Sequence, residues 1–398
     1  MSRRVGRVSA LAIAAVLLAG CGGPAAPSRS ASPPSSSTPV PATDASPAGA
    51  AQLGVLVQRA GGAEPYAIQL VRPDGHALPA VHALARSLKT YRPTVAPCPI
   101  GACPSPAAAT ATANYQLPET SVSATHVYFL DGEADVKSLS PTGSVAFVRH
   151  LELEPNSNVA FAVSPDDRRI AVAVITYPTE ASGVPYTLSL SVEDLAGGGN
   201  RTEVFTSSSM VAWPVGWRAG NVVLAIGQPG VFTAFNPYAA VEYHLVDPAS
   251  WTRQALVTCN FGPLVNAGSA CWKAGTLGRQ DWSGGTQSFR LDPSGPVSRL
   301  QPAYLALSPD GERIAGAVRA GAAGSYDTEL FEDGSESLLA RGAEPLGWLD
   351  GSHLLVVAPT GPAIAAVPGG ALTPVTGLTR LPGQGLPSLL GVLPASLG

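Results

Sequence analysis

Charged side chains are scarce in this sequence. Lys, Arg, Asp and Glu together make up 13% of its 398 residues, and the formal net charge is −4. The basic residues are scattered along the chain and are not interleaved with aromatic residues. Because a nucleic-acid interface needs a concentrated basic surface, nucleic acid is not a predicted partner.

Local catalytic motifs are also missing. The chain contains no Gly-x-Ser-x-Gly nucleophile elbow, no His-Glu-x-x-His metal motif, no phosphate-binding loop and no dinucleotide-binding glycine pattern. Its histidines are dispersed without paired spacing, which is more typical of structural residues than of ligands; they are His76, His82, His126, His150, His244 and His353. The pattern therefore predicts no catalytic residue, no metal site and no cofactor.

The first 20 residues have the pattern of an export signal. Arg3, Arg4 and Arg7 precede an apolar run over residues 10–19, which is too short to span a membrane. The segment ends in Leu-Ala-Gly-Cys21, which resembles the lipobox of bacterial lipoproteins. The resemblance implies a lipid on Cys21, a diacylglyceryl group usually joined by a further acyl chain. An ordinary secretory signal is the alternative.

This signal sets the predicted location and domain order. Gly6 stands where a twin-arginine signal would carry a bulky apolar residue, which favours the general secretory route. Residues 21–50 are almost wholly Gly, Ala, Pro, Ser and Thr, so they predict a disordered tether. The expected order is a signal peptide (1–20), the tether, and a folded body (51–398) on the extracytoplasmic side of the cell membrane.

Two stretches of the body are copies of one pattern. Residues 161–175 and 304–318 each hold an apolar run, a Ser-Pro-Asp turn followed by a basic residue, and a second apolar run. Proline presets φ for such a turn, and short runs that are apolar at nearly every position are typical of strands covered on both faces. Each copy predicts a hairpin, with turns at Ser164, Pro165 and Asp166 and at Ser308, Pro309, Asp310 and Gly311.

Further repeats give the number of units. A Gly-Trp pattern at residues 214–220 returns at 345–351, in the place of the Ser-Pro-Asp turns. Seven outer turns follow one another along the chain, at residues 72–75, 140–143, 193–197, 247–250, 292–295, 332–334 and 368–370. Four-stranded propeller blades recur at roughly 40–50 residues. The sequence therefore predicts an all-β, seven-bladed β-propeller of four-stranded antiparallel blades, or six blades if the degenerate unit at 259–300 is incomplete.

The Ser-Pro-Asp-Gly turn with its basic residue and apolar strand resembles the repeat of TolB-type propellers, which are related in form to WD-repeat propellers. The resemblance implies the fold rather than one activity. Propellers usually close by completing one blade from both chain ends. Residues 53–57 have no inner strand before them and residues 387–393 are left over, so we expect these two segments to pair. A short helix at 77–88 would decorate a loop.

Four cysteines remain besides Cys21: Cys98, Cys103, Cys259 and Cys271. An even count in an exported chain predicts disulfides, and proximity favours Cys98–Cys103 and Cys259–Cys271. A metal site is the alternative, but neither pair has Cys-x-x-Cys spacing and no histidine lies nearby in the sequence.

Two weaker patterns could bind a ligand. Asp131, Glu133 and Asp135 alternate as calcium ligands can, although a solvent-facing hairpin turn is the preferred interpretation. Five of the six tryptophans crowd into one stretch, at Trp213, Trp217, Trp251, Trp272 and Trp282. Trp217 aligns with Trp348 and is expected to pack between blades, whereas Trp272 and Trp282 are the better candidates for an exposed platform.

These observations favour a lipid-anchored binding or protein-interaction scaffold, monomeric, with an envelope protein or a glycan as a possible partner. The alternative is a propeller enzyme, a glycan lyase or hydrolase, whose site is assembled at the central channel from several blades. Such a site would leave no local motif. Binding is preferred because charged residues are sparse and the histidines do not cluster.

Overall fold

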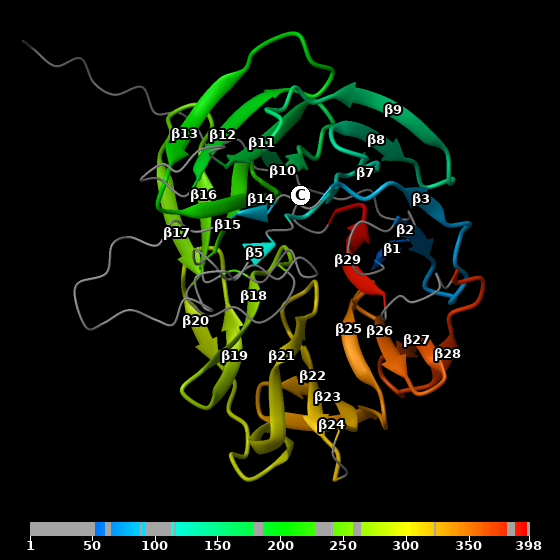
Figure 1. Ribbon diagram of the computed structural model, residues 1–398. Helices are drawn as coiled ribbons and strands as arrows, with labels where there is room; N and C mark the ends of the chain where they lie inside the picture. The colour runs from blue at the N-terminus through cyan, green and yellow to red at the C-terminus, as the bar shows by residue number, and fades with distance from the viewer. Residues whose placement is uncertain are drawn as a thin grey trace, which may run out of the picture. The chain divides into compact units, whose positions relative to one another are not determined.

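The computed structural model describes residues 52–59, 65–87, 90–91, 113–114, 117–177, 186–227, 240, 242–257, 264–321, 324–379 and 387–395. All of them belong to one compact unit. They form antiparallel sheets that follow one another around a ring (Figure 1), which confirms the predicted seven-bladed propeller. The described part contains one helical element, the 3-10 turn η2 (Pro296–Arg299), and no helix able to cross a membrane.

The first three blades, from the inner to the outer strand, use both ends of the chain. Blade 1 is β29 (Ser388–Leu393), β1 (Leu53–Arg59), β2 (Tyr66–Val71) and β3 (Val81–Ala83). Blade 2 is β6 (Thr120–Val122), β7 (Val127–Asp131), β8 (Asp135–Leu139) and β9 (Val145–His150). Blade 3 is β10 (Ser157–Val163), β11 (Arg169–Thr176), β12 (Thr187–Asp194) and β13 (Thr202–Ser207). A small hairpin, β4 (Thr90–Tyr91) and β5 (Ala113–Asn114), lies between blades 1 and 2 in the sequence.

The other four blades follow in chain order. Blade 4 is β14 (Val211–Arg218), β15 (Asn221–Gly227), β16 (Glu242–Val246) and β17 (Arg253–Val257), and blade 5 is β18 (Ser269–Lys273), β19 (Thr276–Gln280) and β20 (Thr286–Ser288). Blade 6 is β21 (Leu300–Leu307), β22 (Ile314–Arg319), β23 (Tyr326–Glu332) and β24 (Ser335–Ala340). Blade 7 is β25 (Glu344–Trp348), β26 (His353–Ala358), β27 (Gly361–Ala366) and β28 (Leu372–Pro374).

The ring is closed by the last strand of the chain. β29 pairs with β1 from Leu53 opposite Leu393 to Val57 opposite Ser388, with one irregularity after Val55. β29 also contacts the inner strands β25 and β6. This pairing is the predicted closure, and it leaves the edge of β1 covered instead of exposed.

The core lies between neighbouring blades because the inner and second strands are covered on both faces. β10 is buried at every position, and β15 is buried at all but its first residue. The apolar clusters accordingly join residues of consecutive blades rather than of single sheets. The near-continuous apolar runs of the sequence follow from this double burial.

The two Ser-Pro-Asp turns have the same hydrogen bonds. In the first, the Ser164 hydroxyl donates to Asp166 Oδ1 at 2.6 Å and accepts from the Arg169 amide at 2.9 Å. In the second, Ser308 bonds Asp310 at 2.5 Å and the Arg313 amide at 2.9 Å. The serine thus links both sides of the reversal, which explains why the motif recurs where an inner strand turns back.

Each Ser-Pro-Asp blade is joined to the next blade by a tryptophan. Trp217 Nε1 donates to the carbonyl of Ala162 at 2.9 Å, and Trp348 Nε1 donates to that of Ala306 at 2.9 Å. The basic residue of the turn stacks over the same indole, Arg169 at 4.7 Å and Arg313 at 5.2 Å from the ring centre. The predicted packing of Trp217 between blades is therefore confirmed. We call this arrangement the tryptophan clasp.

Two sequence-based expectations need correction. The segment expected to form a short helix at 77–88 contains β3, because Val81 pairs with Ile68 and completes blade 1. The degenerate fifth unit is a blade, but it has three strands in the described part of the chain. Its predicted outer turn at 292–295 leads into η2 instead of a fourth strand.

Candidate functional site

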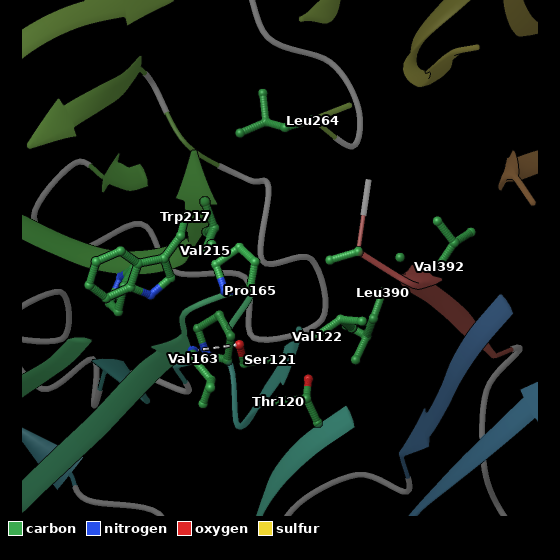
Figure 2. A pocket seen from close by; sticks show the side chains of 15 residues that line it. Thr120, Ser121, Val122, Val163, Pro165, Val215, Trp217, Leu264, Leu390 and Val392 are labelled. Atoms are coloured by element: carbon green, nitrogen blue, oxygen red, sulfur yellow. Dashed lines mark hydrogen bonds between the residues drawn. The ribbon is translucent and has the colours of Figure 1, made fainter. Parts of the chain in front are cut away.

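A cavity that is partly open to solvent lies between β6, β10, β14 and β29 (Figure 2). It reaches the end of the inner strands at which the Ser-Pro-Asp turns lie, and we call it the channel mouth. Its walls consist of Pro118, Thr120, Ser121, Val122, Val163, Pro165, Pro214, Val215, Gly216, Trp217, Leu264, Leu390, Gly391, Val392 and Ala395. The site therefore combines residues from four blades that are far apart in the sequence.

A second, smaller cavity is the repeat counterpart of the channel mouth. It lies between β21, β25 and β29 and shares Leu264, Gly391 and Val392 with the channel mouth. Four more of its wall residues occupy the same repeat positions, namely Leu307, Pro309, Gly347 and Trp348 in place of Val163, Pro165, Gly216 and Trp217. The turn prolines Pro165 and Pro309, predicted as structural, are thus also wall residues.

The wall of the channel mouth is apolar. None of its residues is charged, and none is a histidine. Its two hydroxyl groups differ, because Ser121 Oγ accepts the amide of Val163 at 2.9 Å and so links blades 2 and 3. The Thr120 side chain points at the cavity, and its hydroxyl has no hydrogen bond to another described residue. The wall can therefore bury an apolar group but supplies no acid–base pair for chemistry.

A polar cluster lies beside the channel mouth, between the turns of blades 2 and 3. Thr125 Oγ1 hydrogen-bonds Asp167 Oδ2 and lies 2.6 Å from His126 Nδ1, and that nitrogen is 3.6 Å from the Asp167 carboxylate. The sequence analysis missed this cluster because the two turns are separated by a whole blade. Asp167 in place of the turn glycine was the one signal that could have indicated it.

The three alternating carboxylates have protein partners. Asp131 accepts the amide of Leu84 and the ammonium of Lys137, Glu133 accepts the amide of Ser87 at 2.8 Å, and Asp135 lies 2.6 Å from His150. The hydrogen bonds from Lys137 and Leu84 lower the pKa of Asp131, although burial alone would raise it. The segment is the β7–β8 turn, as predicted, but the Asp131 side chain is only 19% accessible and does not face water.

Three further histidines lie in polar contacts. His244 Nε2 is 2.7 Å from Glu242 on the same strand, and His353 Nδ1 is 2.8 Å from Asp350. His76 Nδ1 lies 3.2 Å from the hydroxyl of Thr376. Within the described residues, no three His, Cys, Asp or Glu side chains are grouped as metal ligands.

The tryptophans are arranged differently from the expectation for an exposed platform. Trp282 donates to the carbonyl of Val265 at 3.1 Å and lies under the guanidinium of Arg218, and Trp272 packs against the core of blades 5 and 6. Both are partly buried, so the expectation of exposure was wrong. Trp251, with 37% of its surface accessible, is the exposed member of the set.

The predicted cysteine chemistry falls mostly outside the described residues. Cys21, Cys98, Cys103 and Cys259 all lie there. Cys271 is buried on β18. The lipid site and both disulfide pairings therefore stay predictions.

A buried ionic group at the opposite end of the inner strands also escaped the sequence analysis. Arg59, at the end of β1, pairs with Glu119, just before β6, at 2.7 Å. Arg86 donates to the carbonyls of Ser157 and Val159 at 3.1 and 3.0 Å, and burial lowers its pKa. These contacts join blades 1, 2 and 3, so the group holds the ring together rather than presenting charge to a ligand.

No protein-family model matches this chain, and no curated protein matches it. Among solved structures it is similar to TolB from Acinetobacter baumannii, with a TM-score of 0.33 and 12% identity, covering 86% of this chain and 65% of that one. It is also similar to an acylaminoacyl peptidase, with a TM-score of 0.42 and 11% identity, over 82% of this chain and 51% of that one. A third similar structure is BamB from Moraxella catarrhalis, with a TM-score of 0.31 and 16% identity, over 64% of this chain and 74% of that one. These likenesses concern the fold alone.

Proposed function

We propose that this protein is a lipid-anchored scaffold on the extracytoplasmic side of a bacterial cell membrane, and that it binds an apolar segment of an envelope partner in the channel mouth. The observation that supports the proposal is the wall of that cavity, which is apolar and carries no charged side chain. Apolar walls of this kind favour burial of aliphatic or aromatic groups.

A charge placed in the wall should abolish such binding. Val215 on β14 lines the channel mouth and is partly buried, so Val215→Glu would leave a carboxylate in an apolar wall. Val204 on β13 is a matched control, because it is partly buried against the same core cluster but lies on an outer strand. Each protein would be cross-linked in intact membranes and captured, and the bound proteins identified by mass spectrometry.

We expect a partner that the wild type and Val204→Glu enrich and that Val215→Glu loses. Equal enrichment by all three proteins would place the interface elsewhere and contradict the proposal. Enrichment of nothing, together with turnover of a glycan or peptide library, would favour the enzyme. The observation on the side of the enzyme is the His126–Asp167 contact beside the channel mouth.

The lipid anchor is a separate part of the proposal and rests on the signal sequence. Cys21→Ala removes the only thiol that the Leu-Ala-Gly-Cys motif offers for acylation. We expect the variant to move from the membrane pellet to the soluble fraction and to lose acyl groups in mass spectrometry of the N-terminal peptide. A wild-type N-terminal peptide without any acyl group, together with a variant that stays in the pellet, would refute the anchor.

A further inference from the structure

The Thr125–His126–Asp167 cluster lies about one strand away from the wall of the channel mouth. Val122, the last residue of β6, lines the cavity and pairs with Val127 of β7. His126 directly precedes Val127, and neighbouring strands are about 4.8 Å apart. His126 is therefore one cross-strand pair and one residue away from a wall residue of the cavity.

The hydrogen bonds of the cluster run in one direction. An ionised carboxylate can only accept, so the Thr125 hydroxyl donates its proton to Asp167 Oδ2. With that proton used, Thr125 Oγ1 must accept from His126 Nδ1, 2.6 Å away. A neutral His126 therefore carries its proton on Nδ1 and a lone pair on Nε2. Nε2 makes no hydrogen bond to a described residue, and 37% of the side chain is accessible.

The carboxylate of this relay occupies a costly position. Asp167 has φ 56°, and the same place in the second Ser-Pro-Asp turn is taken by Gly311 at φ 78°. A residue with a Cβ is strained in the left-handed region, although aspartate tolerates it better than most residues. Burial, then the charge of Asp167 and a hydrogen bond with its carboxylate, raise the pKa of Tyr128 beside it.

The cations of the same turn are engaged elsewhere. Arg169 stacks over Trp217, and the exposed Arg168 lies 4.0 Å from Asp166. The groups that face the imidazole are thus the carboxylate of Asp167, the hydroxyl of Thr125 and the ring of Tyr128, 6.0 Å between ring centres. None of them can donate to Nε2 from its present position, so the lone pair is available to a ligand.

We propose that His126 Nε2 is a fixed hydrogen-bond acceptor at the channel mouth, and that the site selects apolar ligands carrying an O–H or N–H donor. Thr125 and Asp167 act as positioning residues, because they hold the proton on Nδ1. The inference rests on the proposed function in taking the channel mouth as the binding site.

The tautomer can be measured without any ligand. ¹⁵N-histidine-labelled full-length protein would be examined by NMR at about pH 8.5, where an ordinary imidazole is neutral. We expect the Nδ1–H form for His126, and a shift toward the Nε2–H form in Asp167→Gly, which installs the residue of the other turn. His150 serves as an internal reference, since its contact with Asp135 is untouched. An Nε2–H form in the wild type overturns the proposal.

Selection by the acceptor needs two probes that differ only in the donor. Octan-1-ol and 1-methoxyoctane share the octyl chain and an oxygen that can accept a hydrogen bond, but only the alcohol has an O–H group to donate. Their dissociation constants would be measured by ligand-observed NMR for the wild type, His126→Leu, His126→Gln and His150→Leu. Comparing the alcohol-to-ether ratio between proteins cancels the different hydration of the two probes.

We expect the alcohol-to-ether preference to fall by about threefold to tenfold in His126→Leu, the value of one hydrogen bond. It should be partly restored in His126→Gln, whose amide oxygen accepts, and unchanged in His150→Leu. Binding of both probes with the same ratio in all four proteins overturns this inference but leaves the channel mouth as a site. Binding of neither probe to the wild type overturns the proposed function and this inference together.

Discussion

The tryptophan clasp leads to the most direct stability prediction. Trp217→Phe keeps an aromatic ring but removes the indole N–H that donates to Ala162, a residue with no accessible surface. Leaving a buried carbonyl without its donor costs about 1–3 kcal/mol, and the lost ring atoms leave a cavity that adds about 1–2 kcal/mol. We therefore expect the free energy of unfolding to fall by about 2–5 kcal/mol.

The same change in the second clasp provides the test of the repeat. Trp348 has the same hydrogen-bond length to Ala306 and a similar cation over its ring, so Trp348→Phe should lose a similar amount. Trp251→Phe is the control, because Trp251 is exposed and should change stability by no more than about 0.5 kcal/mol.

The measurement is urea unfolding followed by far-ultraviolet circular dichroism, which does not depend on the fluorescence of the replaced residue. A loss below about 1 kcal/mol for Trp217→Phe, or a loss equal to that of Trp251→Phe, would refute the reasoning. A double-mutant cycle between Arg169 and Trp217 then measures the stacking contact, for which we expect a coupling of about 0.5–2 kcal/mol.

Three further predictions follow from the closure, a glycine and the turn carboxylates. Deleting residues 387–395 removes β29 with its three buried apolar side chains, which should lower the free energy of unfolding by about 5–8 kcal/mol. We therefore expect size-exclusion chromatography to show an open or aggregated chain. Gly370→Ala should destabilise far more than Gly132→Ala in thermal unfolding, because φ is alike (67° and 70°) but the new Cβ would lie 2.0 Å from the Leu339 carbonyl only in the former. Although burial alone would raise the pKa of Asp310, hydrogen bonds from Ser308 and the Glu312 amide lower it below its unfolded value. The resulting stability is present above about pH 4 and is lost as the pH falls through the folded pKa, so Asp310→Asn should flatten that part of an acid-unfolding curve.

The architecture could be predicted because the repeated signals are local. A Ser-Pro-Asp turn is built by contacts within six residues, from Ser164 to Arg169, so its sequence alone predicts the hairpin. The closure was predictable for a different reason, since a first unit without an inner strand and an apolar tail without a partner complete each other. By contrast, residues 77–88 offered only a short apolar run. In so short a run, the spacing of apolar residues does not distinguish a helix from a strand.

The candidate site was predictable only in its general place. Val122, Val163, Val215 and Val392 lie on four strands, and their sequence neighbours carry no pattern that distinguishes a channel wall from an ordinary core. The polar cluster is similar, because Thr125 and Asp167 are separated by 42 positions and meet only when two blades pack. The sequence feature that indicates the cluster is Asp167, which stands where the other Ser-Pro-Asp turn has Gly311.

The two cavities suggest why closure and binding belong together in this fold. Gly391 and Val392 of β29 line both the channel mouth and its repeat counterpart. The strand that completes blade 1 is therefore also the shared wall of both cavities, and a ring that opens at β1 loses the site with the fold. The repeat supplies two equivalent apolar walls. Within the described residues, the Thr125–His126–Asp167 cluster lies beside the wall next to blades 2 and 3, and at the other wall Gly311 takes the place of Asp167. A ligand with one donor group would thus be held in one orientation, with the donor toward His126 and the apolar part toward β29.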